Sequence, residues 1–127
     1  DLEVKNLLIV HDFAENGDQN LNMLHRILAA FGAKVHLLQV ANKRTKYEEV
    51  LENMKVFAAS NGLQEYETHI LKNRDVERGV VHFNQMHNID IVCIGTHGKG
   101  GLFHSSTTEK LVKHLFKPII SFHLKEK

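Results

Sequence analysis

Short apolar runs alternate with amphipathic segments along the whole chain. The runs are rich in Leu, Ile and Val and are bounded by polar residues or glycine, which is typical of strands buried inside a sheet. In the segments between them, apolar residues recur at helical spacing, as in helices that pack one face on a sheet. The pattern predicts strands over residues 4–10, 34–40, 65–71, 91–94 and 118–124, and helices over residues 18–31, 47–60, 75–87 and 107–115.

Strands and helices therefore follow one another in strict alternation. This order predicts an α/β fold with one open parallel sheet, because parallel neighbours need a crossover connection. In such sheets, ligands bind at the carboxyl ends of strands, where the winding direction reverses. If the first and fourth strands are neighbours there, Asp12 and Gly95 flank one cleft.

Residue types at the predicted ends of helices are those that favour caps. Gly32 stands where the first helix needs a C-cap, and Asp75 stands where the third needs an N-cap. The strand over residues 65–71 alternates between polar and apolar residues, so we expect an edge strand that is half exposed.

A glycine-rich loop follows the fourth strand, with four glycines between Gly95 and Gly101. Ser106 and Glu109 then have the spacing of a capping box at the start of a helix. A strand, a glycine loop and a helix N-terminus together can direct backbone N–H groups at an anion, usually a phosphate. The loop matches neither GxGxxG nor a P-loop, so a flexible connection that needs glycine for positive φ explains the spacing equally well.

Composition is that of one globular domain over residues 1–127. A net charge of +1 provides no strong field to attract nucleic acid or a membrane surface. No apolar run has the length of a membrane span and no signal-peptide pattern is present, which favours a cytoplasmic protein. The chain begins at Asp1 without Met, so we expect a processed product or one domain of a longer protein.

Other chemistry-bearing residues favour structural roles. The single cysteine excludes an internal disulfide, and its apolar strand predicts a buried, inert thiol at Cys93. Asp12 could act as a base or a metal ligand, but an Asp just after a strand more often caps a turn. Ser105 and Ser106 have no paired base in the sequence, and helix capping explains them.

Neither a metal site nor a nucleic-acid surface is predicted. His11, His97 and His104 lack the spacing of metal ligands, and His82 and His87 do not share one ligand-forming face of their helix. Two groups of basic residues, without interleaved aromatics, are interpreted as solvated faces. They are Lys43, Arg44 and Lys46, and Lys110, Lys113 and Lys117.

The chain resembles the universal stress protein family along nearly its whole length. The likeness lies in VKNLLIVHDF, HLLQVAN, IDIVCIGTHGKGGL and STTEKLVKHLFKPII, which occur in the family's order. The wording of HILKNRDVERGVVHF and PIISFHL is most like the second domain of bacterial tandem members. The resemblance implies strand order 3-2-1-4-5 with helices on both faces, and pairing through the last strand.

Members of this family that bind ATP carry Gly, two residues, Gly, nine residues, then Gly and Ser or Thr. Gly95 and Gly98 match the first two positions. Aligned on the following helix, Ser105 and Ser106 take the place of the late Gly-Ser pair, in a loop about three residues shorter than the pattern. A shorter loop narrows the phosphate cradle, and a Cβ at Ser105 obstructs close backbone approach.

By resemblance, Asp12 and the backbone near Val40 would hold the adenine and ribose. The phosphates would lie against Gly95, Gly98, Ser105, Ser106 and Thr107. The ligand would be ATP or AMP, with magnesium, if the protein has a cofactor at all.

Two hypotheses follow for function. The first is a regulatory stress-response domain that acts through dimerisation and protein contacts and is not an enzyme. The alternative is a switch that binds ATP or AMP and hydrolyses it slowly at most. The expected partner is a second copy or a sister domain, because the apolar last strand offers an edge for pairing through Ile119, Ile120 and Phe122.

Overall fold

A computed structural model describes residues 3–10, 13, 18–19, 22–73, 75–97, 110–111, 113–115 and 117–125. The strands are β1 (Asn6–Val10), β2 (Asp18–Gln19), β3 (Lys34–Ala41), β4 (Tyr66–Lys72), β5 (Ile91–His97) and β6 (Ile119–Lys125). The helices are α1 (Asn22–Phe31), α2 (Tyr47–Ser60) and α3 (Val76–His87). Residues 110–111 and 113–115 are also helical. Within this part of the chain, no helix is both long and apolar enough to cross a bilayer.

One sheet organises the molecule, with strand order β2-β6-β5-β1-β3-β4. Five strands run parallel, and the two-residue β2 pairs antiparallel with the end of β6. Numbered along the chain without β2, the parallel strands have the order 3-2-1-4-5, so the predicted topology is confirmed. The central strand is β1, which pairs with β3 on one side and β5 on the other.

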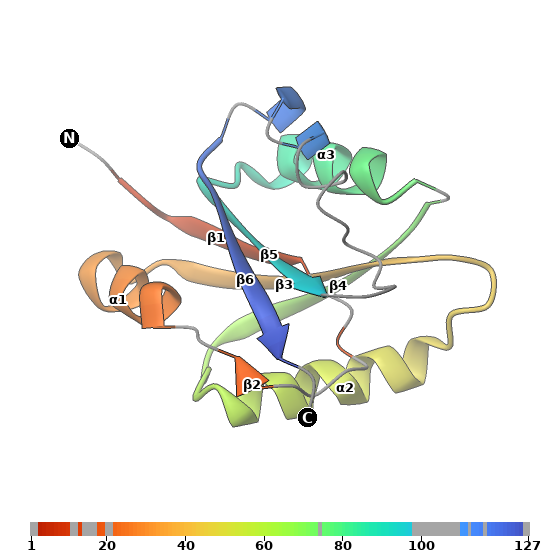
Figure 1. Ribbon diagram of the computed structural model, residues 1–127, viewed down its shortest axis with the longest axis horizontal. Coiled ribbons are helices and arrows are strands. Elements are labelled where there is room, and N and C mark those ends of the chain that lie inside the picture. Colours follow the sequence, from red (N-terminus) through yellow and green to blue (C-terminus); the bar gives the residue numbers. More distant parts are fainter. Residues whose placement is uncertain are drawn as a thin grey trace.

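Helices cover both faces of the sheet, as predicted. In Figure 1, α1 and α2 lie on one face, and α3 lies on the other with the short helical segment near residue 111. Alternate residues of β1 serve the two layers: Leu7 and Ile9 pack with α1 and α2, and Leu8 and Val10 pack with α3. Two apolar layers therefore hold the central strand from both sides.

The third helix shows how the sequence sets an element boundary. The Asp75 carboxylate accepts hydrogen bonds from the N–H groups of Glu77 and Arg78, at 3.0 and 3.4 Å, so the predicted N-cap is confirmed. Asn88 follows the helix with φ of +50°, a left-handed residue that ends it. This cap fixes where α3 begins relative to the carboxyl end of β4.

Three predicted boundaries within the described residues differ from the structure by two residues or more. The first helix begins at Asn22 and not near Asp18, because Asp18 and Gln19 are extended and pair with Leu124 and Lys125. The fourth strand continues three residues beyond its predicted end, since β6 pairs with it as far as His97. The first strand begins at residue 6, two residues later than predicted.

Candidate functional site

The winding direction reverses at the carboxyl ends of β1 and β5. Val10 pairs with Ile94 at the last position that the two strands share. From β1 the chain passes through β2, at the outer edge of β6, and through α1 to β3, which pairs with β1 on the side away from β5; from β5 it continues to β6 on the other side. The predicted adjacency of the first and fourth strands is thus confirmed, and a cleft between Asp12 and Gly95 stays a prediction. Five predicted site residues lie outside the described part of the chain: Asp12, Gly98, Ser105, Ser106 and Thr107.

A buried glutamine anchors the segment that follows β1. The Phe13 N–H donates to Gln39 Oε1 at 3.4 Å, and both residues are buried. The Phe13 ring packs edge-on against Phe57 of α2, with ring centroids 5.0 Å apart. Gln39 therefore holds Phe13 in place, three residues after the end of β1, a role that its sequence context did not reveal.

Val40, the predicted contact for adenine and ribose, has its side chain in the core. Only 6% of it is exposed, and α3 lies directly against it. A Cβ added to Gly79 of α3 would lie 3.0 Å from both γ-carbons of Val40. Because the side chain is enclosed in this way, Val40 can offer a ligand only its backbone groups, as the resemblance implied.

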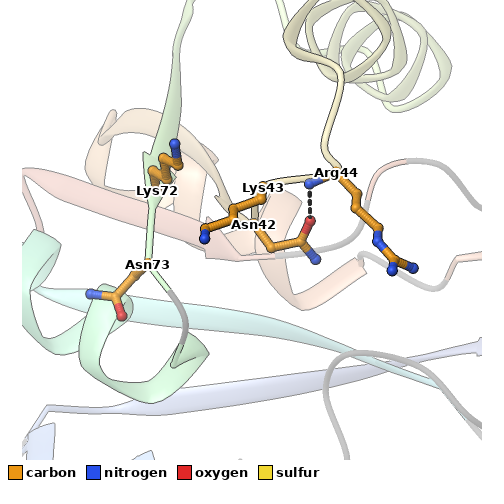
Figure 2. A pocket seen from close by; sticks show the side chains of 5 residues that line it. All are labelled: Asn42, Lys43, Arg44, Lys72 and Asn73. Carbon is orange, nitrogen blue, oxygen red and sulfur yellow. Dashed lines mark hydrogen bonds between the residues drawn. The ribbon is translucent and has the colours of Figure 1, made fainter.

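A cavity of about 620 Å³ opens beyond the carboxyl ends of β3 and β4. It is lined by Asn42, Lys43, Arg44, Lys72 and Asn73 (Figure 2). These residues belong to the two segments that leave the strands, and Ala41 pairs with Lys72 where the strands end. The cavity therefore begins two residues after Val40, on the edge where the fold predicts a ligand.

Local hydrogen bonds shape the cavity wall. The Arg44 N–H donates to Asn42 Oδ1 at 2.8 Å, and the Asn42 N–H donates to Thr45 Oγ1 at 3.0 Å. Where the paired strands β3 and β4 end, the Asn73 N–H donates to the Ala41 carbonyl at 3.0 Å. These bonds fix the backbone of the segments that follow β3 and β4. The side chain of Lys43 extends toward Asn73 (Figure 2).

The described residues that line this cavity are mostly cationic. Among them, Lys43, Arg44 and Lys72 carry a positive charge, and Asn42 and Asn73 are amides. Ammonium, guanidinium and amide N–H groups all donate hydrogen bonds to anions. From the sequence, Lys43 and Arg44 were interpreted as part of a solvated basic face. The pairing of β3 with β4 brings Lys72 close to this loop, and no pattern in the sequence predicts that contact.

Gly95 lies within β5 and not in a loop. It is buried and stands in register with Phe122 of β6. The first three residues of the predicted loop, 95–97, thus belong to β5, and the rest of it lies outside the described residues. The phosphate-binding role of Gly95 stays a prediction.

The last strand borders a largely open edge. Ile119 and Ile120 are half-buried and pair with Val92 and Cys93 of β5. On its outer side, β6 meets β2 at Leu124 and Lys125 alone among the described residues. The stretch predicted to pair with a partner therefore has no neighbouring strand on its outer side within the described chain.

Comparisons with known proteins show which proteins share this sequence pattern and this fold. The profile of the universal stress protein family matches residues 3–123. A universal stress protein crystallised in complex with cAMP is 14% identical, has a TM-score of 0.73, and the match covers 98% of this chain and 100% of that one. A universal stress protein from Archaeoglobus fulgidus is 18% identical, with a TM-score of 0.68 and 94% of each chain covered.

Some similar structures are much longer than this chain. In a second universal stress protein from Archaeoglobus fulgidus DSM 4304, the match covers 96% of this chain but 44% of that one, at 18% identity and a TM-score of 0.65. A search of curated proteins found no match. The match to the family profile spans almost the whole sequence and agrees with the strand order, so the chain belongs to the universal stress protein family.

Proposed function

We propose that this chain is a regulatory domain that binds an adenine nucleotide and acts through binding and not through catalysis. The observation that carries the proposal is the cationic cavity of about 620 Å³ at the carboxyl edge of the sheet. Ligand sites of small molecules have volumes of roughly 300–1,000 Å³. The structural neighbour in complex with cAMP supports an adenine nucleotide as the ligand class.

The chemistry of the lining suits binding better than turnover. Lysine, arginine and asparagine donate hydrogen bonds to phosphate, whereas general acid–base catalysis uses groups that titrate near neutral pH. All the described residues that line the cavity are of the first kind. The proposed site continues from this cavity toward Gly95 and the predicted residues Asp12, Gly98, Ser105, Ser106 and Thr107, with the Val40 backbone at its base.

The shortened glycine loop favours a nucleotide with few phosphates. A loop about three residues shorter than the ATP-binding pattern leaves less room for a triphosphate and its magnesium ion. We therefore expect AMP or cAMP to bind more tightly than ATP. Tighter binding of ATP with magnesium would show that the loop still forms a full phosphate cradle.

Calorimetry with AMP, cAMP, ADP and ATP, each with and without magnesium, tests the proposal. In Lys43→Ala and Lys72→Ala variants, affinity for the best ligand should fall roughly tenfold, because each loses a charge-assisted hydrogen bond. Lys55→Ala, at an exposed position of α2, is the matched control and should bind normally. Absence of both heat and thermal shift with every nucleotide at millimolar concentration would refute nucleotide binding.

We also propose that the domain pairs with a second copy or a sister domain through β6. The outer edge of Ile119–His123 supports this, because unpaired strand edges tend to be paired or covered. Sedimentation velocity over a concentration series should show a dimer. Amide exchange of residues 119–123 should slow as concentration rises, while exchange in β4 should not change. A monomer at high concentration, with exchange independent of concentration, would contradict the pairing.

A further inference from the structure

Three metal-binding side chains converge near the beginnings of β3 and β4, on the face that α3 covers. In the register of these strands, His36 lies beside Glu67, and His69 follows two residues later on the same face. His36 Nδ1 lies 3.1 Å from His69 Nε2 and 3.3 Å from Glu67 Oε2. His69 Nε2 and Glu67 Oε2 are 3.5 Å apart. One ligand atom from each side chain therefore faces a common point.

These distances match a tetrahedral metal site. Ligand atoms bound to zinc at about 2.0–2.1 Å in tetrahedral geometry are separated by about 3.3–3.4 Å. Two imidazole nitrogens and one carboxylate oxygen are a known zinc ligand set, with the fourth position left to water. We propose that His36, Glu67 and His69 form a binding site for a zinc ion.

The surroundings of His36 present the correct nitrogen to a metal. Its Nε2 lies 3.0 Å from Asn6 Oδ1, and Asn6 Nδ2 is directed at the Asn88 carbonyl at 3.5 Å. This orientation makes Asn6 Oδ1 an acceptor, so His36 carries its proton on Nε2 and its lone pair on Nδ1. A hydrogen-bonded outer partner of this kind is typical of histidines that bind metals.

A hydrogen-bond network alone explains the cluster less well. Lys34 Nζ donates to Glu67 Oε1 at 2.6 Å, so Glu67 Oε2 is the oxygen that faces the two rings. His36 Nδ1 lies 3.3 Å from this oxygen, and both atoms are acceptors because the ring proton of His36 is on Nε2. Of the three facing atoms, His69 Nε2 alone can donate, at 3.1 Å to His36 Nδ1 and 3.5 Å to Glu67 Oε2. A cation at the common point would satisfy all three atoms together.

The cluster is accessible and is separate from the cavity. The side chains of Glu67 and His69 are 45% and 21% exposed, which gives a metal a route from solvent. The His87 ring, 5.1 Å from the His69 ring between centroids, forms part of the wall. His36 precedes Ala41 by five residues, or about 17 Å along a strand, so this ion would not touch a ligand in the cavity.

Metal titration of the chelator-treated, dialysed protein tests the site directly. Calorimetry with zinc should give one ion per chain, and zinc should raise the melting temperature. Cobalt(II) should give the strong visible absorption of a tetrahedral complex, and zinc should abolish it. Binding of magnesium with no binding of zinc, or a cobalt spectrum of an octahedral complex, would overturn the proposal.

Matched variants locate the ion. Glu67→Gln and His69→Gln each remove one ligand at a partly exposed position, so they should fold and bind zinc at least ~100-fold more weakly. Asn6→Ala should weaken binding by ~10- to 100-fold, through the orientation of His36. The control His25→Ala removes an exposed histidine of α1 and should bind as the parent does. Equal zinc affinity in all four variants would refute the site, and circular dichroism reports whether each is folded.

Discussion

Individual residues decide how closely helix α3 approaches the candidate site. Gly79 has no side chain, and the γ-carbons of Val40 occupy the space just beyond it. Alanine is favoured over glycine by up to about 1 kcal/mol in a helix, but overpacking a core costs about 1–3 kcal/mol. At 3.0 Å the packing cost is the larger effect, because both contacting atoms belong to a stiff, buried valine.

Gly79→Ala should therefore destabilise the protein by about 1 kcal/mol, measured by urea unfolding. Adding the same change to a Val40→Ala background should cost less or stabilise, because the space beyond Gly79 is then free. A double-mutant cycle with both changes isolates this coupling. Equal effects of Gly79→Ala in the two backgrounds would show that Val40 does not limit the approach of α3.

The buried thiol of Cys93 should be inert, as the sequence predicted. Only 2% of the residue is exposed, and burial raises the pKa of the thiol to about 12. Since the folded pKa exceeds the unfolded one, this group contributes stability below the unfolded pKa, which is lost as pH rises through the alkaline range up to about 12. At pH 8, iodoacetamide should label the native protein only as fast as it unfolds, and urea should accelerate labelling sharply. Rapid complete labelling in native buffer would contradict this burial.

At the scale of elements, one carboxylate ties the starts of two central strands together. Asp90 Oδ2 accepts hydrogen bonds from the N–H groups of Lys5 and Asn6, both at 2.9 Å. The Asp90 N–H donates in return to the Asn6 carbonyl at 2.9 Å. These bonds join segments more than 80 residues apart, just before β1 pairs with β5.

Removing this carboxylate should weaken the pairing of β1 with β5. Asp90→Ala should lower the free energy of unfolding by about 1–3 kcal/mol, because two N–H groups lose a charged acceptor. Asp90→Asn keeps an acceptor oxygen and should cost less. Chemical denaturation of the three proteins measures the difference, and an unchanged unfolding midpoint in Asp90→Ala would show that water replaces the carboxylate.

The sequence predicted regular elements well because their signals are local. The bounds of α2 and the N-cap of α3 followed from apolar periodicity and from Asp75. The two-residue β2 has too few residues for any periodicity, and it exists through pairing with β6. Likewise, His36 and His69 stand 33 positions apart, so only the register of β3 with β4 brings them together.

The edge of the sheet that carries the candidate site was predictable, but its strands and its composition were not. Alternation of strands and helices predicted a ligand at the carboxyl ends of β1 and β5, whereas the cavity lies at the carboxyl ends of β3 and β4. The cationic lining depends on Lys72 reaching the loop after β3, which is a tertiary event. The motif-based residues, apart from Val40 and Gly95, lie outside the described chain.

At the scale of the whole molecule, stability should be highest at the centre of the sheet. Strand β1 is flanked by a strand on each side and by an apolar layer on each face, and Leu7, Leu8, Ile9 and Val10 have no exposed surface. Amides of β1 should therefore exchange with solvent only on global unfolding, and amides of β4 should exchange through smaller openings. Native-state hydrogen exchange followed by NMR measures this gradient. Slower exchange in β4 than in β1 would contradict it.

The two borders of the sheet differ in a way that limits how copies could join. Strand β4 ends the sheet with charged residues along it, among them Glu67 and Lys72, and such residues discourage a further strand from adding there. Of the two borders as the described residues form them, the β6 border is the better suited to docking a like strand. Two molecules that meet border to border about a twofold axis use up both suitable borders at once. Assembly by this route should therefore stop at a closed pair, and growth into fibres is disfavoured by the architecture itself.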